Sequence, residues 1–180
     1  MRFRRLLNWQ SALLLLATTA ATPGLLTAQR DNDTASSRGK YTLASVCGDY
    51  GIIATYGANV ARALGSQTVD GHGKLTGSAI VNQPGSNNTR IIVSIGLTGT
   101  YTVNADGTGQ MIVTVTLPGG GTATVTEDFV ITKTKTRDGV AIATEIQDAQ
   151  EVPSAVIDES SLVTHSYFLR GTPRSCTAER

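Results

Sequence analysis

The chain has 180 residues, with 15 basic and 14 acidic side chains and a formal net charge of +1. This length is typical of one domain. A basic surplus this small does little to neutralise the phosphates of a nucleic acid, so nucleic acid is not an expected partner.

The first residues have the pattern of a secretory signal peptide. Arg2, Arg4 and Arg5 form a basic start, residues 12–17 read A-L-L-L-L-A, and small residues lead to Ala28. The apolar run is too short for a membrane span, which needs about 20 residues. The pattern predicts a signal peptide over residues 1–28, export to the periplasm or beyond the cell, and no transmembrane segment in the mature protein. An N-terminal anchor that is never cleaved is the alternative interpretation.

The segment that follows is polar. Residues 29–40 are rich in Asp, Ser, Arg and Asn, a composition that cannot bury enough apolar surface to fold. We expect residues 29–45 to form a disordered leader and residues 46–180 to form the folded domain.

Short stretches of alternating apolar and polar residues fill the rest of the chain, and glycine-rich turns separate them. This pattern, with abundant Thr and Val, is typical of an all-β sandwich or barrel. The expected strands cover residues 49–56, 62–69, 74–81, 90–103, 109–117, 122–134, 140–150 and 162–170.

The turns indicate how these strands connect. Asp-Gly pairs stand at 70–71, 106–107 and 138–139, and residues 118–121 read P-G-G-G. Such sequences favour tight hairpins, because glycine supplies the positive φ and Asp bonds its own backbone. Consecutive hairpins form a meander, and a meander of about eight strands hides its two edges best by closing on itself. We therefore predict a single closed antiparallel up-and-down barrel.

Cys47 and Cys176 are the only cysteines, and they flank the expected barrel. Two thiols in an exported protein are expected to form a disulfide bond, and closure of the barrel would bring the two ends within the reach of about 7 Å between Cα atoms that a disulfide needs. Two free buried thiols or a metal pair are the alternatives. Two cysteines without a nearby pair of histidines make a poor zinc site, so we expect no metal and no other cofactor.

Three motifs carry a resemblance to known proteins: C-G-x-Y-G at 47–51, V-D-G-H-G-K-L-T-G at 69–77 and T-G-T-Y-T-V-N-A-D-G-T-G at 98–109. Over residues 47–171 the chain resembles a group of short exported bacterial proteins with a calycin-type barrel, similar to the allene oxide cyclase barrel. The resemblance implies the fold. The plant cyclases that share this barrel isomerise a fatty-acid epoxide, but no motif here places their functional residues, so none is carried over.

Alternation along the strands predicts which side chains face the barrel interior. The apolar face of the sixth strand includes Glu127 and Phe129, the last strand carries His165 and Tyr167 on one face, and the first strand carries Tyr50 and Tyr56. The candidate ligand-pocket residues are therefore Glu127, His165, Tyr50, Tyr56, Phe129 and Tyr167. A mostly apolar cup with these polar groups could bind a small amphipathic ligand or move a proton. Alternatively, the polar groups lie near the rim, where they are solvated or paired for structural reasons.

The remaining charged residues are expected to be ordinary surface. His72 stands in a hairpin turn and is expected to be solvated. The acidic pairs Asp148 and Glu151, and Asp158 and Glu159, stand at strand ends or in loops, where charges are usually solvated.

Three functions stay open on these observations. The first is a non-enzymatic binder of a small apolar ligand, such as a lipid, or of an envelope or surface partner. The second is a cyclase or isomerase that acts on an apolar substrate inside the barrel, with catalytic residues that the sequence does not identify. The third is a structural envelope protein. A lumen filled by side chains would leave no room for the small ligand of a binder or for the substrate of a cyclase or isomerase.

Overall fold

The computed structural model describes residues 40–57, 60–151, 162–171 and 176. The predicted signal peptide and residues 29–39 of the predicted leader lie outside these described residues. Among the residues described, no helix has the length and apolar character needed to span a membrane.

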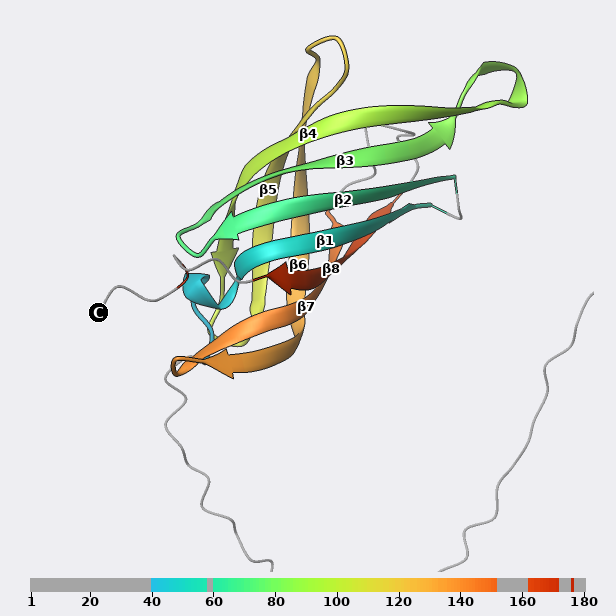
Figure 1. Cartoon of the computed structure of the whole chain (residues 1–180). Helices are drawn as coiled ribbons and strands as arrows, with labels where there is room; N and C mark the ends of the chain where they lie inside the picture. Colours follow the sequence, from blue (N-terminus) through green and yellow to red (C-terminus); the bar gives the residue numbers. More distant parts are fainter. Residues whose placement is uncertain (1–39, 58–59, 152–161, 172–175, 177–180) are drawn as a thin grey trace, which may run out of the picture. The chain divides into compact units, whose positions relative to one another are not determined.

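Eight strands form a closed barrel in which each strand pairs antiparallel with the next and β8 closes onto β1 (Figure 1). This confirms the predicted all-β, closed, up-and-down architecture. The strands are β1 (Cys47–Tyr56), β2 (Ala61–Asp70), β3 (Lys74–Pro84), β4 (Arg90–Val103), β5 (Thr108–Thr116), β6 (Thr122–Arg137), β7 (Val140–Gln150) and β8 (Val163–Gly171).

The Asp-Gly sequences make the hairpin turns for the expected reason. Gly107, between β4 and β5, has a φ of +92°, a value that an L side chain rarely adopts. Beside it, the Asp106 carboxylate accepts a hydrogen bond from the backbone N–H of Thr108 at 3.0 Å, which stabilises the turn locally. Gly71 and Gly139 have φ values of +81° and +80° in the turns after β2 and β6. The order of strands around the barrel therefore follows from short-range turn chemistry.

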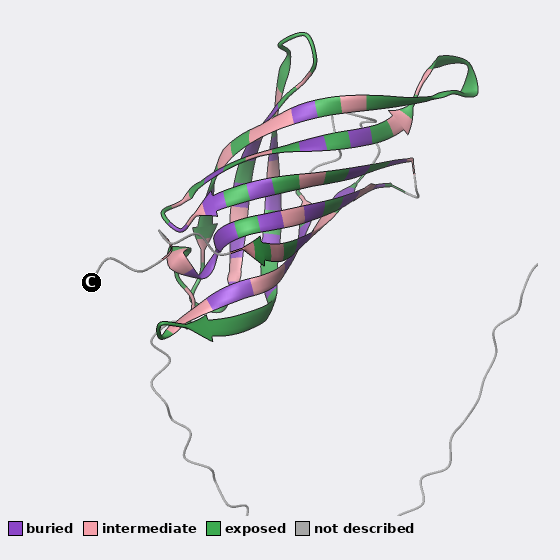
Figure 2. Cartoon of the chain, in the orientation of Figure 1, coloured by how far each residue is buried: buried purple, intermediate pink, exposed green. Residues whose placement is uncertain are grey.

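Buried and exposed residues alternate along the strands, as Figure 2 shows. In β1, the inward residues are Tyr50, Ile52, Ala54 and Tyr56. Inward residues from all eight strands fill the barrel with one hydrophobic core, so the lumen is largely packed and any ligand site must occupy a gap in that packing.

Residues 40–45, which the sequence assigns to the disordered leader, instead cover one end of the barrel. Tyr41 packs against the core, and the short 3₁₀ helix η1 (Leu43–Ser45) leads directly into β1. The Tyr101 hydroxyl lies 2.9 Å from the carbonyl oxygen of Val46 and 3.1 Å from that of Leu43, close enough to donate to either. The order of this segment comes from such contacts with a strand that is distant in sequence.

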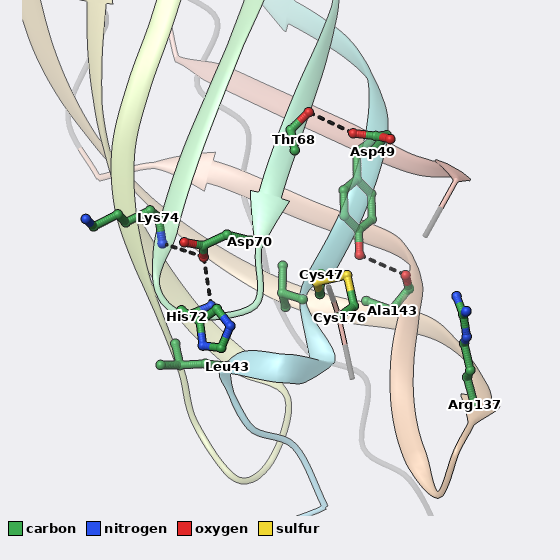
Figure 3. The surroundings of a disulfide bond; sticks show 12 residues. Leu43, Cys47, Asp49, Thr68, Asp70, His72, Lys74, Arg137, Ala143 and Cys176 are labelled. Atoms are coloured by element: carbon green, nitrogen blue, oxygen red, sulfur yellow. Dashed lines mark hydrogen bonds between the residues drawn. A yellow bond between two sulfur atoms is a disulfide. The ribbon is translucent and has the colours of Figure 1, made fainter. Parts of the chain in front are cut away.

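The predicted disulfide bond between Cys47 and Cys176 is confirmed, and it lies at the same end of the barrel (Figure 3). The two Cα atoms are 5.7 Å apart. Beside the bond, the Asp70 carboxylate accepts hydrogen bonds from the backbone N–H groups of His72 and Lys74, and the His72 side chain is exposed as expected. Two residues 129 positions apart in the sequence are thus joined where the first and last strands meet.

Candidate functional site

The barrel lumen contains a small cavity of about 40 Å³. Because one water molecule needs about 10–15 Å³ of such volume, the cavity has room for about three waters. One wall comes from strands β2 to β5 and is aliphatic except for Gln67 on β2; its apolar residues are Ala63, Ala79, Ile95, Leu97, Val113 and Val115. The facing wall comes from β1, β6, β7 and β8 and contains the polar residues Tyr56, Glu127, Gln150, His165 and Tyr167. The cavity is therefore mostly apolar on one side, and most of its polar groups lie on the other.

Strand register brings the polar groups together. Glu127 on β6 is paired with Gln150 on β7, and Asp148 on β7 is paired with His165 on β8. Directly opposed residues in antiparallel strands have their side chains on the same face of the sheet. Since Glu127 and Asp148 are buried in the lumen, their partners point toward it as well.

Asp148 is the centre of the resulting hydrogen-bond network. One of its oxygens, Oδ1, accepts from the backbone N–H of His165 at 2.7 Å and lies 2.8 Å from the ring Nδ1 of His165. Its other oxygen, Oδ2, accepts from the hydroxyl of Tyr167 at 2.7 Å. The side chain of Asp148 is fully shielded from solvent, and a buried carboxylate is tolerated where hydrogen bonds of this kind replace water.

Glu127 is just as buried but has fewer partners. The residue is 3% exposed. Its Oε2 lies 3.2 Å from the Tyr167 hydroxyl, and its Oε1 lies 3.6 Å from His165 Nδ1, beyond hydrogen-bond distance. Tyr167 has a single hydroxyl proton, and the shorter contact directs it to Asp148. An ionised Glu127 therefore lacks a short hydrogen bond from this cluster, whereas a protonated Glu127 can donate one to the Tyr167 oxygen.

The electrostatics of the cluster follow from this arrangement. Burial, reinforced by the charge of Asp148, raises the pKa of Glu127 to about 7, although the nearby His165 opposes the shift. For His165, burial works against the charged ring, but the charge of Glu127 and the bond to Asp148 outweigh it and raise the pKa. Burial, with the charges of Glu127 and Asp148, also raises the pKa of Tyr56 to about 12. In each case a neighbouring carboxylate favours the protonated form, which indicates a negative potential in the cavity.

Four of the six predicted pocket residues, Glu127, His165, Tyr56 and Tyr167, line this cavity, and two do not. Tyr50 is buried near the end covered by η1, where its hydroxyl donates to the carbonyl oxygen of Ala143 at 2.9 Å. Phe129 packs over Gly109 on the neighbouring strand, where a Cβ atom would collide with its ring. Both side chains face inward as predicted, but they lie at other positions along the barrel axis, away from the cavity.

The interpretation of Asp148 as solvated surface is wrong. Asp148 lies at the centre of the cluster, because it shares the inward face of β7 with Ile146. The same alternation also places Gln150, two residues further on, on the cavity wall. The sequence did contain a signal for both residues: Asp148 and Gln150 follow the buried Ile146 by two and four positions, which places all three on one face of the strand. Charge and position near the end of a strand suggested solvent instead. Asp158 and Glu159 lie outside the described residues.

Glu127, Asp148 and His165 each offer one metal-ligand atom, and these atoms lie within 4.8 Å of one another. A zinc ion would bind each such atom at about 2.0–2.2 Å. Here His165 Nδ1 instead makes a 2.8 Å contact with Asp148 Oδ1, which is a hydrogen-bond distance. Both atoms are therefore already engaged with each other, and we interpret the trio as a hydrogen-bonded acid–base cluster.

We expect the free energy of unfolding to fall as the pH rises from about 4.5 to 7. The pKa of Glu127 increases on folding from 4.5 to about 7, so the native state binds more protons than the unfolded chain in this window. The stabilisation is complete below pH 4.5 and is lost as the pH rises through 7. The raised pKa of His165 acts in the same direction.

Urea unfolding across this pH range measures the effect. Glu127→Gln should flatten the dependence, because it removes the titrating carboxyl and also a charge that holds the proton on His165. Glu145→Gln is the matched control, since Glu145 pairs with Lys133 outside the cavity. Equal slopes in the wild type and in Glu127→Gln would contradict the assignment.

The motifs that resemble calycin-type barrels correspond to structural features of the fold. Residues 69–77 span the turn between β2 and β3, and residues 98–109 span the turn between β4 and β5. Neither motif contains a polar residue of the cluster, so the resemblance stays a prediction about the family. Comparison with known proteins finds no family model that matches the chain, and no significant match among curated proteins or solved structures.

Proposed function

We propose that this protein is a non-enzymatic binder that holds a small amphipathic molecule in the barrel lumen. One observation carries the proposal: the lumen cavity has a largely aliphatic wall on β2 to β5, and a buried cluster of polar groups on β6 to β8 lies opposite that wall. Ligand sites combine apolar lining with a few placed polar groups in this way. The apolar part of the ligand packs on the aliphatic wall, and its polar end meets Glu127.

We also propose that the protein is exported. A disulfide bond that closes the barrel is typical of the periplasm or the extracellular space. The ligand is small, because the cavity has the volume of about three waters. The cavity is not fully enclosed, so a short alkyl chain with one polar end can occupy it and extend from its opening, whereas a long-chain lipid would be left largely outside.

Filling the cavity should abolish binding. Ala79 is buried and lines the aliphatic wall, whereas its neighbour Ile80 faces outward and is 55% exposed. Ala79→Phe should weaken binding of 1-butanol at least about tenfold, because the added ring occupies the space of the ligand. The measurement is a titration followed by the amide chemical shifts of the protein. Ile80→Phe is the matched control and should bind as the wild type does.

A milder variant covers the case in which Ala79→Phe does not fold. Ala63→Val adds two methyl groups to the same wall and should weaken binding several-fold with an unchanged β-rich circular dichroism spectrum. Unaltered butanol binding in both folded variants, or no binding by the wild type, would overturn the proposed function.

A second candidate function is acid–base isomerisation of an apolar substrate. Its specific support is a carboxyl group with a pKa of about 7 that lines the cavity beside a histidine, since a general acid–base works best with a pKa near the working pH. Glu127 would take a proton from one carbon of the substrate and return it to another. Any molecule that co-purifies with the protein should then be converted to an isomer of equal mass by the wild type and not by Glu127→Gln.

A further inference from the structure

We infer that the polar end of the ligand is a protonated amine, held by the carboxylate of Glu127 and the side-chain oxygen of Gln150. This inference rests on the proposed function and adds the chemical class of the ligand. It follows from the acceptors that the cavity presents, from the charge of its walls and from the proton that Glu127 carries.

The cavity presents hydrogen-bond acceptors that lack donors. The Oε1 atom of Gln150 is buried without a hydrogen-bond partner among the described residues, although a buried polar atom usually has one. Gln150 is paired across the strands with Glu127, and both line the cavity. The hydroxyl of Tyr167 and the Nδ1 of His165 are both directed at Asp148. A ligand that donates hydrogen bonds satisfies the two remaining acceptors.

The charge of the cavity walls favours a cation over an anion. Glu127 lines the cavity, and Asp148 lies within hydrogen-bond distance of two further lining residues, His165 and Tyr167. Among the described lining residues there is no Lys or Arg, and His165 is the one group that can carry a positive charge. Once Glu127 is ionised, above a pH of about 7, the carboxylate of a fatty acid would meet two like charges in a poorly solvated site, and His165 alone could oppose them. An ammonium group would pair with Glu127 there.

Binding of an amine should be linked to ionisation of Glu127. In the free protein Glu127 holds a proton up to a pH of about 7, and an ammonium ion pairs with the carboxylate and not with the neutral acid. Affinity for the amine therefore increases as the pH rises through 7. The titratable groups that face Glu127 are Tyr56 from β1, Asp148 from β7, and His165 and Tyr167 from β8. Loss of the His165 proton makes the cavity more negative and acts in the same direction.

The test compares three ligands that share one alkyl chain: n-butylamine, 1-butanol and butyrate. Each is titrated into the intact disulfide-bonded protein at pH 8 and pH 5.5, with amide chemical shifts as the readout. At pH 8 the amine should bind at least about tenfold more tightly than the alcohol, since a charge-assisted hydrogen bond is roughly twice as strong as a neutral one. Butyrate should bind most weakly. The advantage of the amine should shrink several-fold at pH 5.5, where Glu127 is protonated.

Two variants assign the effect to the proposed atoms. Glu127→Gln should weaken butylamine binding at least about tenfold at pH 8 and change butanol binding less than about twofold. Asp128→Asn is the matched control, because Asp128 is the exposed neighbour of Glu127 on the outer face of β6. Gln150→Met removes the second acceptor at similar volume and should weaken amine binding several-fold. It keeps the inference testable if Glu127→Gln does not fold.

The outcomes separate this inference from the proposed function. If butanol or butyrate binds as tightly as butylamine, or if Glu127→Gln and Gln150→Met leave amine binding unchanged, the ligand is not specifically an amine. The proposed binding site in the lumen is then unaffected. If ZnCl₂ binds with one-to-one stoichiometry, displaces butylamine and requires His165, the cation is a metal ion and the inference is overturned. If none of the three ligands binds, the proposed function fails with it.

Discussion

Removal of the Cys47–Cys176 disulfide is expected to lower the free energy of unfolding by about 5 kcal/mol. The bond links residues 129 positions apart, and a cross-link over a loop of this length restricts the unfolded chain by about that amount at 25 °C. It also joins the start of β1 to the segment after β8, the two strands that close the barrel. A domain with a typical stability of 5–15 kcal/mol would lose a large part of it.

Urea unfolding of Cys47→Ala/Cys176→Ala measures this effect. Alanine is preferred to serine because Cys47 is fully buried, and a buried hydroxyl without a partner would add a cost of its own. The wild type under strong reducing conditions serves as the matched comparison and should unfold at the same urea concentration as the double variant. A loss below about 1 kcal/mol would show that the disulfide contributes little to holding the barrel closed.

The second large effect is expected from Asp148→Ala, which should lower the free energy of unfolding by about 3–5 kcal/mol. The carboxylate of Asp148 accepts from two nitrogens of His165 and from the hydroxyl of Tyr167. Its removal leaves these buried donors without a partner, and each unsatisfied group costs about 1–3 kcal/mol. Most of the expected loss of stability therefore comes from the unpaired donors of His165 and Tyr167 that remain in the lumen. The hydrogen bonds that are lost would by themselves lower the stability by less.

Two further variants separate this explanation from a general effect of removing charge. Asp128→Ala, at an exposed position on the outer face of β6, should change the stability by no more than about 0.5 kcal/mol. Asp148→Asn keeps one acceptor oxygen for His165 and should cost less than Asp148→Ala. Equal losses for Asp148→Ala and Asp128→Ala would contradict the network described for the lumen.

The architecture and the inward direction of single side chains could be predicted from the chain because both depend on local rules. A turn such as Asp106-Gly107 selects a hairpin from the conformations of a few residues. The two-residue period of a strand then places Glu127 on the same face as Phe129, and His165 on the same face as Tyr167. The disulfide followed from the number of cysteines and the expected compartment.

The composition of the site was decided by the tertiary structure. Alternation distinguishes inside from outside, but only the pairing register between strands sets the level of a residue along the barrel. Register places Glu127 beside Gln150 and Asp148 beside His165, and it leaves Tyr50 and Phe129 away from the cavity. Register depends on the closure of all eight strands at once, because β8 must meet β1. Periodicity within one strand carries no information about that closure, and so the acid–base cluster becomes visible only in the folded barrel.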